Sequence, residues 1–419
     1  MAIARWLGTA KTNVQSGTVI VAGYHSGDTY KLVMTDEAGK TFDIASTIGT
    51  TNASVTAGLL ADQWNDSNNA KAQQVTASVS TATITLTADT AGVPFQIQIT
   101  ISGGSGGSVT AYAAATDGEN SGPNDYGTAE NWDTGAVPTS SDSVIIPSGT
   151  NSILYSLNQS AITIMGFRVE EGYSGSIGGT DNGYLKIVLD TADEVYFAGT
   201  GQAWIDVGAS PISDPIIENT YSPGSGEYGL SLKGSLISCI YLRKGHLGYG
   251  IQDDDTTTEV DSIFISFIDD PANDSTLVLG KGVTDTGGGG DPDVKMNGGK
   301  CYAWCDVDVL VVENQGDYQQ LKGKWATCTC VNGTVRPDNY NASQTYGTTL
   351  LANSAKLIKQ NKVACTFGVV TVKSNDVTID DDNGAISWNG TTSIDWDNCK
   401  IDGCTINPGF NKKIVITSS

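Results

Sequence analysis

The chain has little of what most catalytic and membrane proteins depend on. It contains two histidines, His25 and His246, and no run of about 18 apolar residues, so a membrane-spanning helix is not expected. Its first residues lack the apolar core of a secretory signal. No Gly-x-Ser-x-Gly elbow occurs, and both histidines stand in turn-like sequence. We therefore expect synthesis in the cytoplasm, no membrane partner and no catalytic triad.

Basic residues are also scarce. The chain has 23 Lys and Arg against 46 Asp and Glu, which gives a net charge of −23. Residues 1–112 hold only five basic and seven acidic residues, so almost all of the excess acidity lies beyond them. Because a nucleic-acid-binding protein needs a basic footprint, nucleic acid is not expected as a partner.

Cysteine is missing from the first part of the chain, and all eight cysteines lie between Cys239 and Cys404. Cys328 and Cys330 are two residues apart, so on a strand both thiols face the same side. Buried free thiols agree with a cytoplasmic origin, although disulfides remain open. A zinc site from Cys301, Cys305, Cys328 and Cys330 also remains open, but the CxxC spacing typical of zinc knuckles is missing. No cofactor is predicted.

What the chain does contain is turn-rich β sequence, with 50 glycines and only 16% charged residues. Residues 1–112 predict a compact α+β module, which we call the first module. Its helix should begin at Asn52 or Ser54, end near Trp64 and bury a stripe that includes Val55, Leu59 and Leu60. Alternating strands are expected at 17–23, 29–35, 40–45, 74–80, 82–88 and 94–101, before a flexible Gly-rich hinge at 103–108.

A second region begins at Asn131, after a polar linker at 113–130. The stretch Asn131–Ile146 combines an aromatic anchor, Trp132, with a turn, a Val-Pro pair and a β-branched strand. Short apolar runs separated by Gly, Asp, Asn and Ser then continue almost to the last residue, without a fixed repeat. We predict a mainly β protein in which 131–419 form an irregular parallel β-helix. One or two β-sandwiches are the alternative, and Leu350–Lys359 could form one short helix.

Two parts of the chain resemble known families. The hairpin, the helix with Leu59, Leu60 and Trp64, and the stretch Leu86–Ile101 resemble small domains of bacteriophage structural proteins. Asn131–Ile146 resembles the first turn of right-handed parallel β-helices in adhesins and phage fibre proteins. The resemblance implies a tailed-bacteriophage structural protein, either a capsid decoration or head fibre, or a tail fibre or spike. It further implies a location on the virion surface, capsid or tail proteins as partners, and self-association as a homotrimer.

Exposed aromatic side chains are the best binding signal in the second region. On a coil flank they would stack on a host-surface glycan or on a partner, whereas buried ones would only fill the coil. Segments at 269–297 and 332–346 interrupt the strand pattern and are where recognition is expected. The acidic residues Asp285, Asp291 and Asp293 around a Gly run are a weak calcium candidate. A glycoside hydrolase-like tailspike or a glycan-binding adhesin is the alternative function, although no catalytic pair is assigned. The aromatic candidates are Trp304, Trp325, Tyr340, Tyr346, Trp388 and Trp396.

Overall fold

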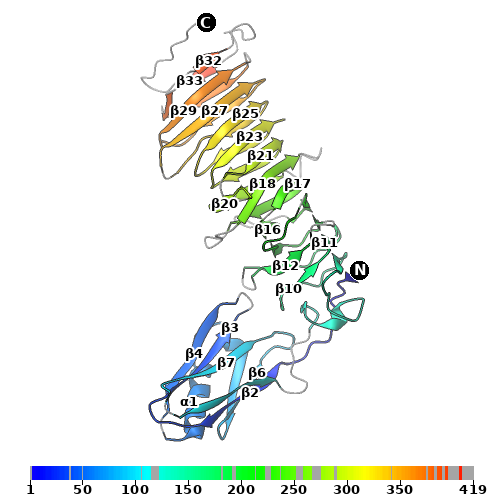
Figure 1. Ribbon diagram of the computed structural model, residues 1–419, viewed down its shortest axis with the longest axis vertical. Coiled ribbons are helices and arrows are strands. Elements are labelled where there is room, and N and C mark those ends of the chain that lie inside the picture. Colours follow the sequence, from blue (N-terminus) through cyan, green and yellow to red (C-terminus); the bar gives the residue numbers. More distant parts are fainter. Residues whose placement is uncertain are drawn as a thin grey trace.

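The protein consists of a small α+β module and a long stack of β-coils (Figure 1). The structure is a computed structural model. It describes residues 2–36, 39–49, 51–104, 106–114, 122–180, 183–190, 195–212, 214–221, 228–235, 237–251, 258–266, 275–286, 290–340, 342–373, 376–381, 385–388, 392–394 and 405–407. Two separate hydrophobic cores, one in each part, hold these residues together.

The first module is built from two antiparallel sheets and one helix. One sheet has the order β5-β6-β2-β8 and the other β4-β3-β7. Inward residues of both sheets pack with the helix, and the indole N–H of Trp64 donates to the carbonyl of Val75 at 2.7 Å. The elements are β2 (Ser16–Gly23), β3 (Thr29–Thr35), β4 (Thr41–Ile48), α1 (Ala53–Asn65), η1 (Ala72–Gln74), β5 (Val75–Ser80), β6 (Thr83–Ala88), β7 (Gln96–Ser102) and β8 (Ser108–Ala114).

The helix α1 follows the prediction at its start and departs from it in its buried face. The side chain of Asn52 accepts a hydrogen bond from the backbone N–H of Val55 at 3.0 Å and so caps the first turn. Leu60 and Trp64 are buried as expected, but Val55 is 42% exposed and Leu59 only half-buried. Small residues of the helix occupy the core instead, because the sheets approach it closely.

The expected hinge at 103–108 belongs to the module itself. Its described residues lie between β7 and β8, and β8 pairs antiparallel with β2. The backbone N–H of Gly107 donates to the carboxylate of Asp28 at 3.0 Å, which ties this turn to the module. The strand β8 was missed because five of its seven residues are exposed and their burial does not alternate with a period of two.

The second region is a parallel β-helix, as predicted. Among the described residues every strand pairing within it is parallel, and the strands in the middle of each wall pair with the strands one turn earlier and one turn later, which rules out the sandwich alternative. What we call the first coil sheet contains β1 (Ile3–Arg5), β9 (Ser143–Ile146), β11 (Gly166–Val169), β13 (Val195–Phe197), β15 (Ile216–Asn219), the start of β17 (Ile237–Tyr249), β18 (Thr258–Ser266), β21 (Asp293–Asn297), β23 (Val307–Glu313), β25 (Trp325–Val331), β27 (Gln344–Ala352), β29 (Cys365–Val372), β31 (Ile386–Trp388) and β32 (Thr392–Ile394).

A second coil sheet forms the other wall, and the long strand β17 bends from one wall to the other. The short strand β20 (Val283–Thr284) pairs with the start of β18 beside these walls. The second coil sheet contains β10 (Asn158–Ile164), β12 (Leu185–Leu189), β14 (Ala203–Asp206), β16 (Leu230–Lys233), the end of β17, β19 (Thr276–Leu279), β22 (Lys300–Ala303), β24 (Asp317–Gln320), β26 (Thr334–Arg336), β28 (Lys356–Lys359), β30 (Thr378–Asp381) and β33 (Thr405–Asn407).

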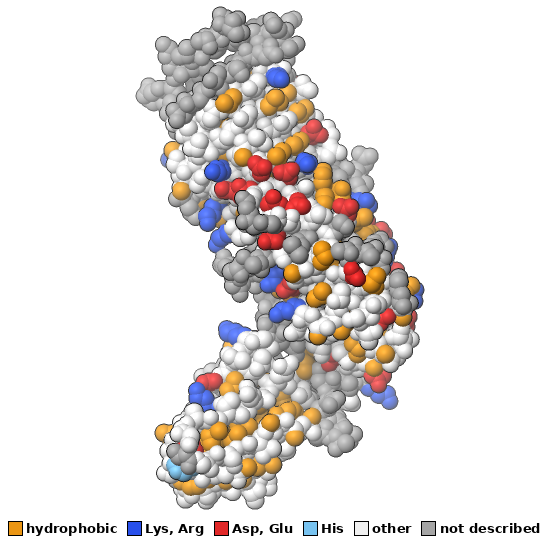
Figure 2. Space-filling view, in the orientation of Figure 1, with side chains coloured by type: hydrophobic (Ala, Val, Ile, Leu, Met, Phe, Trp, Pro, Cys, Tyr) orange, Lys and Arg blue, Asp and Glu red, His pale blue; other side chains and the backbone are white. Residues whose placement is uncertain are grey.

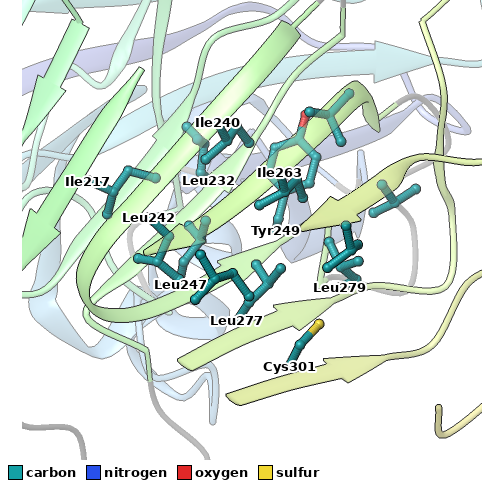
Figure 3. Packing of buried hydrophobic residues seen from close by; sticks show 14 of the residues in the cluster. Ile217, Leu232, Ile240, Leu242, Leu247, Tyr249, Ile263, Leu277, Leu279 and Cys301 are labelled. Atoms are coloured by element: carbon teal, nitrogen blue, oxygen red, sulfur yellow. The ribbon is translucent and has the colours of Figure 1, made fainter. Parts of the chain in front are cut away.

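The coil is held together by ladders of inward side chains. Because the sheets are parallel and in register, one inward position repeats on each turn and its side chains stack. Side chains from the two walls point toward one another in a continuous core (Figure 3), and each fully buried aliphatic residue contributes about 1.5–3 kcal/mol. One ladder of the first coil sheet runs through Ile240, Ile263, Val294, Leu310, Cys328, Thr349 and Val370.

The N-terminal end of the chain belongs to the coil and not to the sheets of the first module. β1 pairs parallel with β9, in the register Ala4 to Val144, and the N-terminus lies beside the first coils (Figure 1). The sequence-based boundaries at 112 and 131 stay predictions, but this pairing crosses them. The N-terminal strand adds a layer below the first full turn.

The stretch Asn131–Ile146 closes the first coil, as expected for an entry turn. Trp132 is 2% exposed, and its indole N–H donates to the carbonyl of Tyr126 at 2.9 Å. The Asn131 amide donates to the carbonyls of Gly122 and Asp125 at 2.7 and 2.8 Å and accepts from the N–H of Ala10 at 2.8 Å. A short 3₁₀ turn, η2 (Ala129–Asn131), precedes Trp132. We call Trp132 and Tyr126 the aromatic cap.

The helix suggested for Leu350–Lys359 was wrong. These residues form the end of β27 and the strand β28, with a turn between them at Asn353 and Ser354, both of which have positive φ. The alternate burial of Leu351, Leu357 and Lys359 has a period of two, which is a strand signal. Among the described residues no helix is long and apolar enough to cross a lipid bilayer.

Candidate functional site

Two of the predicted contact residues, Trp325 and Tyr346, lie inside the coil. Both are 0% exposed, and their ring centroids are 4.2 Å apart. Tyr346 also stacks on Phe367 at 5.3 Å, and the indole of Trp325 donates to the hydroxyl of Thr349 at 3.1 Å. These rings fill the inside of the coil, so they cannot contact a glycan or partner from outside.

Trp304 and Tyr340 occupy the outside of one corner of the coil. Backbone hydrogen bonds place Trp304, Leu321 and Tyr340 on successive turns: the N–H of Leu321 donates to Ala303 at 2.8 Å, and that of Tyr340 donates to Leu321 at 3.1 Å. Tyr340 is 55% exposed, while Trp304 and Leu321 are half-buried. We call these three residues the corner stripe. The structure brings these two predicted residues to one edge.

The remaining two predicted aromatics are described in part or not at all. The backbone of Trp388 lies in β31, where it pairs with Phe367 of the previous turn. Trp396 lies outside the described residues.

Sequence reasoning missed a ladder of aromatic and basic side chains on the outer face of the first coil sheet. Tyr241 stacks on Phe264 with ring centroids 5.1 Å apart and planes at 13°, and Lys295 lies over Phe264 at 5.2 Å. Tyr196 lies two turns before Tyr241, and Arg168, one further turn back, lies over the ring of Tyr196 at 4.5 Å. We call these five residues the outer ladder. The outer ladder could have been found only from the outward position of each residue on its strand, and that position can be assigned only when the register of the strands is known.

Acidic side chains gather on one face of the coil (Figure 2). Asp291 lies close enough to Asp306 and Asp308 for their charges to act on it. Asp285 and Asp261 share a hydrogen bond, which raises the pKa of Asp285 to about 6 and lowers that of Asp261. The hydroxyl and backbone N–H of Thr286 also donate to Asp261. Two carboxyl groups that share a proton lie too close to hold a sugar between them, because glycosidase pairs are about 5–9.5 Å apart.

No group of three or more His, Cys, Asp or Glu that could hold a metal occurs in the described part of the chain. Asp285, Asp291 and Asp293 therefore do not converge as a calcium site there. Burial raises the pKa of Asp291, and the charges of Asp306 and Asp308 raise it further. This surface repels anions and attracts cations only diffusely.

The described cysteines are free thiols. Those buried in the coil core have the surroundings of unreactive, protonated thiols. Cys301, Cys305, Cys328 and Cys330 are buried, and burial raises the pKa of Cys305 to about 12. Cys328 and Cys330 face the core together, as predicted. With their thiols protonated at neutral pH they behave as small apolar residues, so neither the zinc nor the disulfide alternative describes them.

A pocket of about 230 Å³ lies where the first module meets Tyr155 of the coil. Lys71 and Asp36 provide its charged groups, and Met34, Val75, Val93 and Pro94 its apolar wall. None of its lining residues is a histidine or cysteine, and it has no paired carboxylates.

Comparison with known proteins finds no match: no protein-family model, no curated protein and no solved structure is significantly similar to the chain.

Proposed function

We propose that this chain is a non-enzymatic structural protein of a tailed-bacteriophage particle. It would decorate the capsid or form a projecting fibre or spike, with the first module as its attachment end and the coil pointing outward. Capsid or tail proteins would be its partners, and the coils would associate as a homotrimer on the virion surface.

The observation that carries this proposal is the division of the molecule into two cores with different surfaces. The coil core runs without a break from Ala4 to Ile386, which suits a rigid rod. Nearly all of the net charge lies outside residues 1–112, which keeps a projecting rod soluble. The first module, by contrast, is nearly neutral and exposes Ile48, Val55 and Val79 by 59, 42 and 43%.

Electron microscopy of purified particles tests the proposal. Rod-shaped density at capsid lattice positions indicates a decoration or head-fibre protein, and density at the tail tip alone indicates a tail fibre or spike. Particles that lack the protein altogether would refute a structural role.

The attachment end has its own test in the full-length chain. Ile48→Asp should prevent incorporation into particles, because it places a charge on the proposed contact surface. Val369→Asp, at a position 37% exposed on the coil, is the matched control and should be incorporated like the unaltered chain. If Ile48→Asp is incorporated normally while Val369→Asp is not, the coil is the attachment end.

A glycan-binding adhesin is the second candidate, and the corner stripe favours it. An exposed tyrosine and, two turns before it on the same corner, a half-buried tryptophan offer ring faces on which sugars stack. Binding of host-surface polysaccharide that is lost in Tyr340→Ala would support this function. Release of oligosaccharides by the unaltered chain would instead indicate a hydrolase.

A further inference from the structure

The inner face of the second coil sheet changes character towards its C-terminal turns. One inward position reads Leu279, Ala303 and Gln320 on successive turns. Further along the same wall, Lys359 pairs with Asp381, and both are buried. An apolar wall therefore ends in polar and charged groups that have no access to water.

Lys359 is the least expected of these groups. Its side chain is 0% exposed, and its Nζ lies 3.8 Å from Oδ1 of Asp338, whose side chain is 2% exposed. Burial lowers the pKa of Lys359, although Cys365, Asp338 and Asp381 oppose this effect. An amine that loses its proton in a dry site is a nucleophile.

An amide carbonyl lies beside this amine. Nζ of Lys359 contacts Oδ1 of Asn361, and the same oxygen accepts from the backbone N–H of Val363 at 3.2 Å. Nδ2 of Asn361 donates to the carbonyl of Asn339 at 2.9 Å, which fixes the plane of the amide. A backbone donor on the oxygen polarises the carbonyl and stabilises the negative charge that develops during attack.

Asp338 is placed to carry the proton. Apart from the lysine, its carboxylate accepts from the N–H groups of Gln360 at 2.9 Å and Asn361 at 3.2 Å, and from Nε2 of Gln319 at 3.1 Å. It therefore keeps three donors even when the lysine bears no charge. The buried charge of Lys359 is the costly one, and an amide in its place would remove that cost.

We propose that Lys359 and Asn361 form an intramolecular isopeptide bond without any other protein. Asp338 takes a proton from the Lys359 ammonium, and the free amine attacks Cγ of Asn361. The Nζ–Cγ bond forms, and Asp338 passes its proton to Nδ2 and takes the second proton from Nζ. The Cγ–Nδ2 bond breaks, and ammonia leaves with that second proton as ammonium. No oxidant, reductant or cofactor is consumed. The product closes a ring across the turn between β28 and β29, independently of what the particle is.

Mass spectrometry of the denatured full-length chain tests this step. The expected mass is lower than the sequence mass by one ammonia. Fragmentation should place the loss on a peptide that contains both residues, and trypsin should fail to cleave after Lys359. Lys359→Met and Asp338→Asn should each show the full mass calculated from its own sequence. Lys356→Met, which alters an exposed lysine of the same strand, should still show a mass lower than its sequence mass by one ammonia.

The unaltered chain alone decides the matter if a variant does not fold. A full sequence mass with normal cleavage after Lys359 overturns the proposal. So does a loss of water mapped to Lys359 and Asp338, because that would be a different bond. An ammonia loss that persists in folded Lys359→Met would show a chemistry of asparagine alone and would also overturn it.

Discussion

Trp6 packs edge-on against Trp132, with ring centroids 5.2 Å apart and planes at 72°. The two residues also form an antiparallel bridge, so the N-terminal strand is fastened to the cap of the coil by both backbone and rings. Tyr126 also packs edge-on against Trp132, with ring centroids 4.8 Å apart. An exposed coil end is a sheet edge that could pair with other chains, and this aromatic cap covers it.

We therefore predict that Trp132→Ala destabilises the coil by about 3–5 kcal/mol, the usual cost of removing a buried tryptophan. Chemical denaturation measures this loss. Because the two parts have separate cores, the transition of the first module should not move. Trp304→Ala is the control, since Trp304 is only half-buried, and a loss as large as that of Trp132→Ala would contradict the role of the cap.

The carboxyl pair Asp261–Asp285 predicts a pH dependence. The folded pKa of Asp285, about 6, lies above its ordinary value of 3.8, so the folded chain holds an extra proton between these values. Its contribution to stability is complete below pH 3.8 and is lost as the pH rises through 6. The lowered pKa of Asp261 acts in the opposite sense and costs stability only at still lower pH. Moving from pH 7.5 to 5 should therefore stabilise the coil.

The effect should stay below about 1 kcal/mol, because the pair lies at the surface. In Asp285→Asn the amide donates to Asp261 at every pH, so the difference in unfolding free energy between pH 5 and 7.5 should shrink. Asp308→Asn, an exposed acidic residue of the same surface, is the control. An unchanged pH profile in Asp285→Asn would show that the shared proton does not contribute.

Much of the architecture could be predicted because it depends on local pattern. The Asn52 cap and the alternation of strands such as Thr29–Thr35 report local structure directly. The pairing of β1 with β9 could not be predicted, because three residues carry no signal for a partner far away in the sequence. The helix prediction for Leu350–Lys359 was wrong because two short strands joined by a tight turn can imitate the apolar spacing of a helix.

The candidate site was harder to predict than the fold. Whether an aromatic residue on a strand faces the core or the solvent depends on register, and a shift of one residue exchanges the two faces. Trp325 therefore could not be separated from Trp304 by composition. The surroundings of Lys359 were also hidden, because Asp338 and Asp381 meet it only across turns of the coil.

Thiol accessibility follows from the position of each cysteine. In the folded chain Cys301, Cys305 and Cys328 should not react with iodoacetamide, since they are buried and their thiols stay protonated. Cys239 is half-buried and should react first among the described cysteines. Peptide mapping by mass spectrometry measures each site, and a denatured sample shows full reaction. Rapid labelling of Cys328 in the folded chain would contradict the buried ladder.

Two neighbouring residues on β18 point to opposite faces of the coil, and their substitutions should therefore differ in cost. Ile263 is 0% exposed and stacks in the core ladder, so Ile263→Ala should cost about 2–5 kcal/mol. Phe264 points outward and is only half-buried, and its stacking on Tyr241 contributes about 0.5–1.5 kcal/mol beyond the burial of area. Phe264→Ala should therefore cost clearly less, although it removes more atoms. Denaturation of both variants measures the difference, and a reversed order would mean that the register of this strand is shifted by one residue.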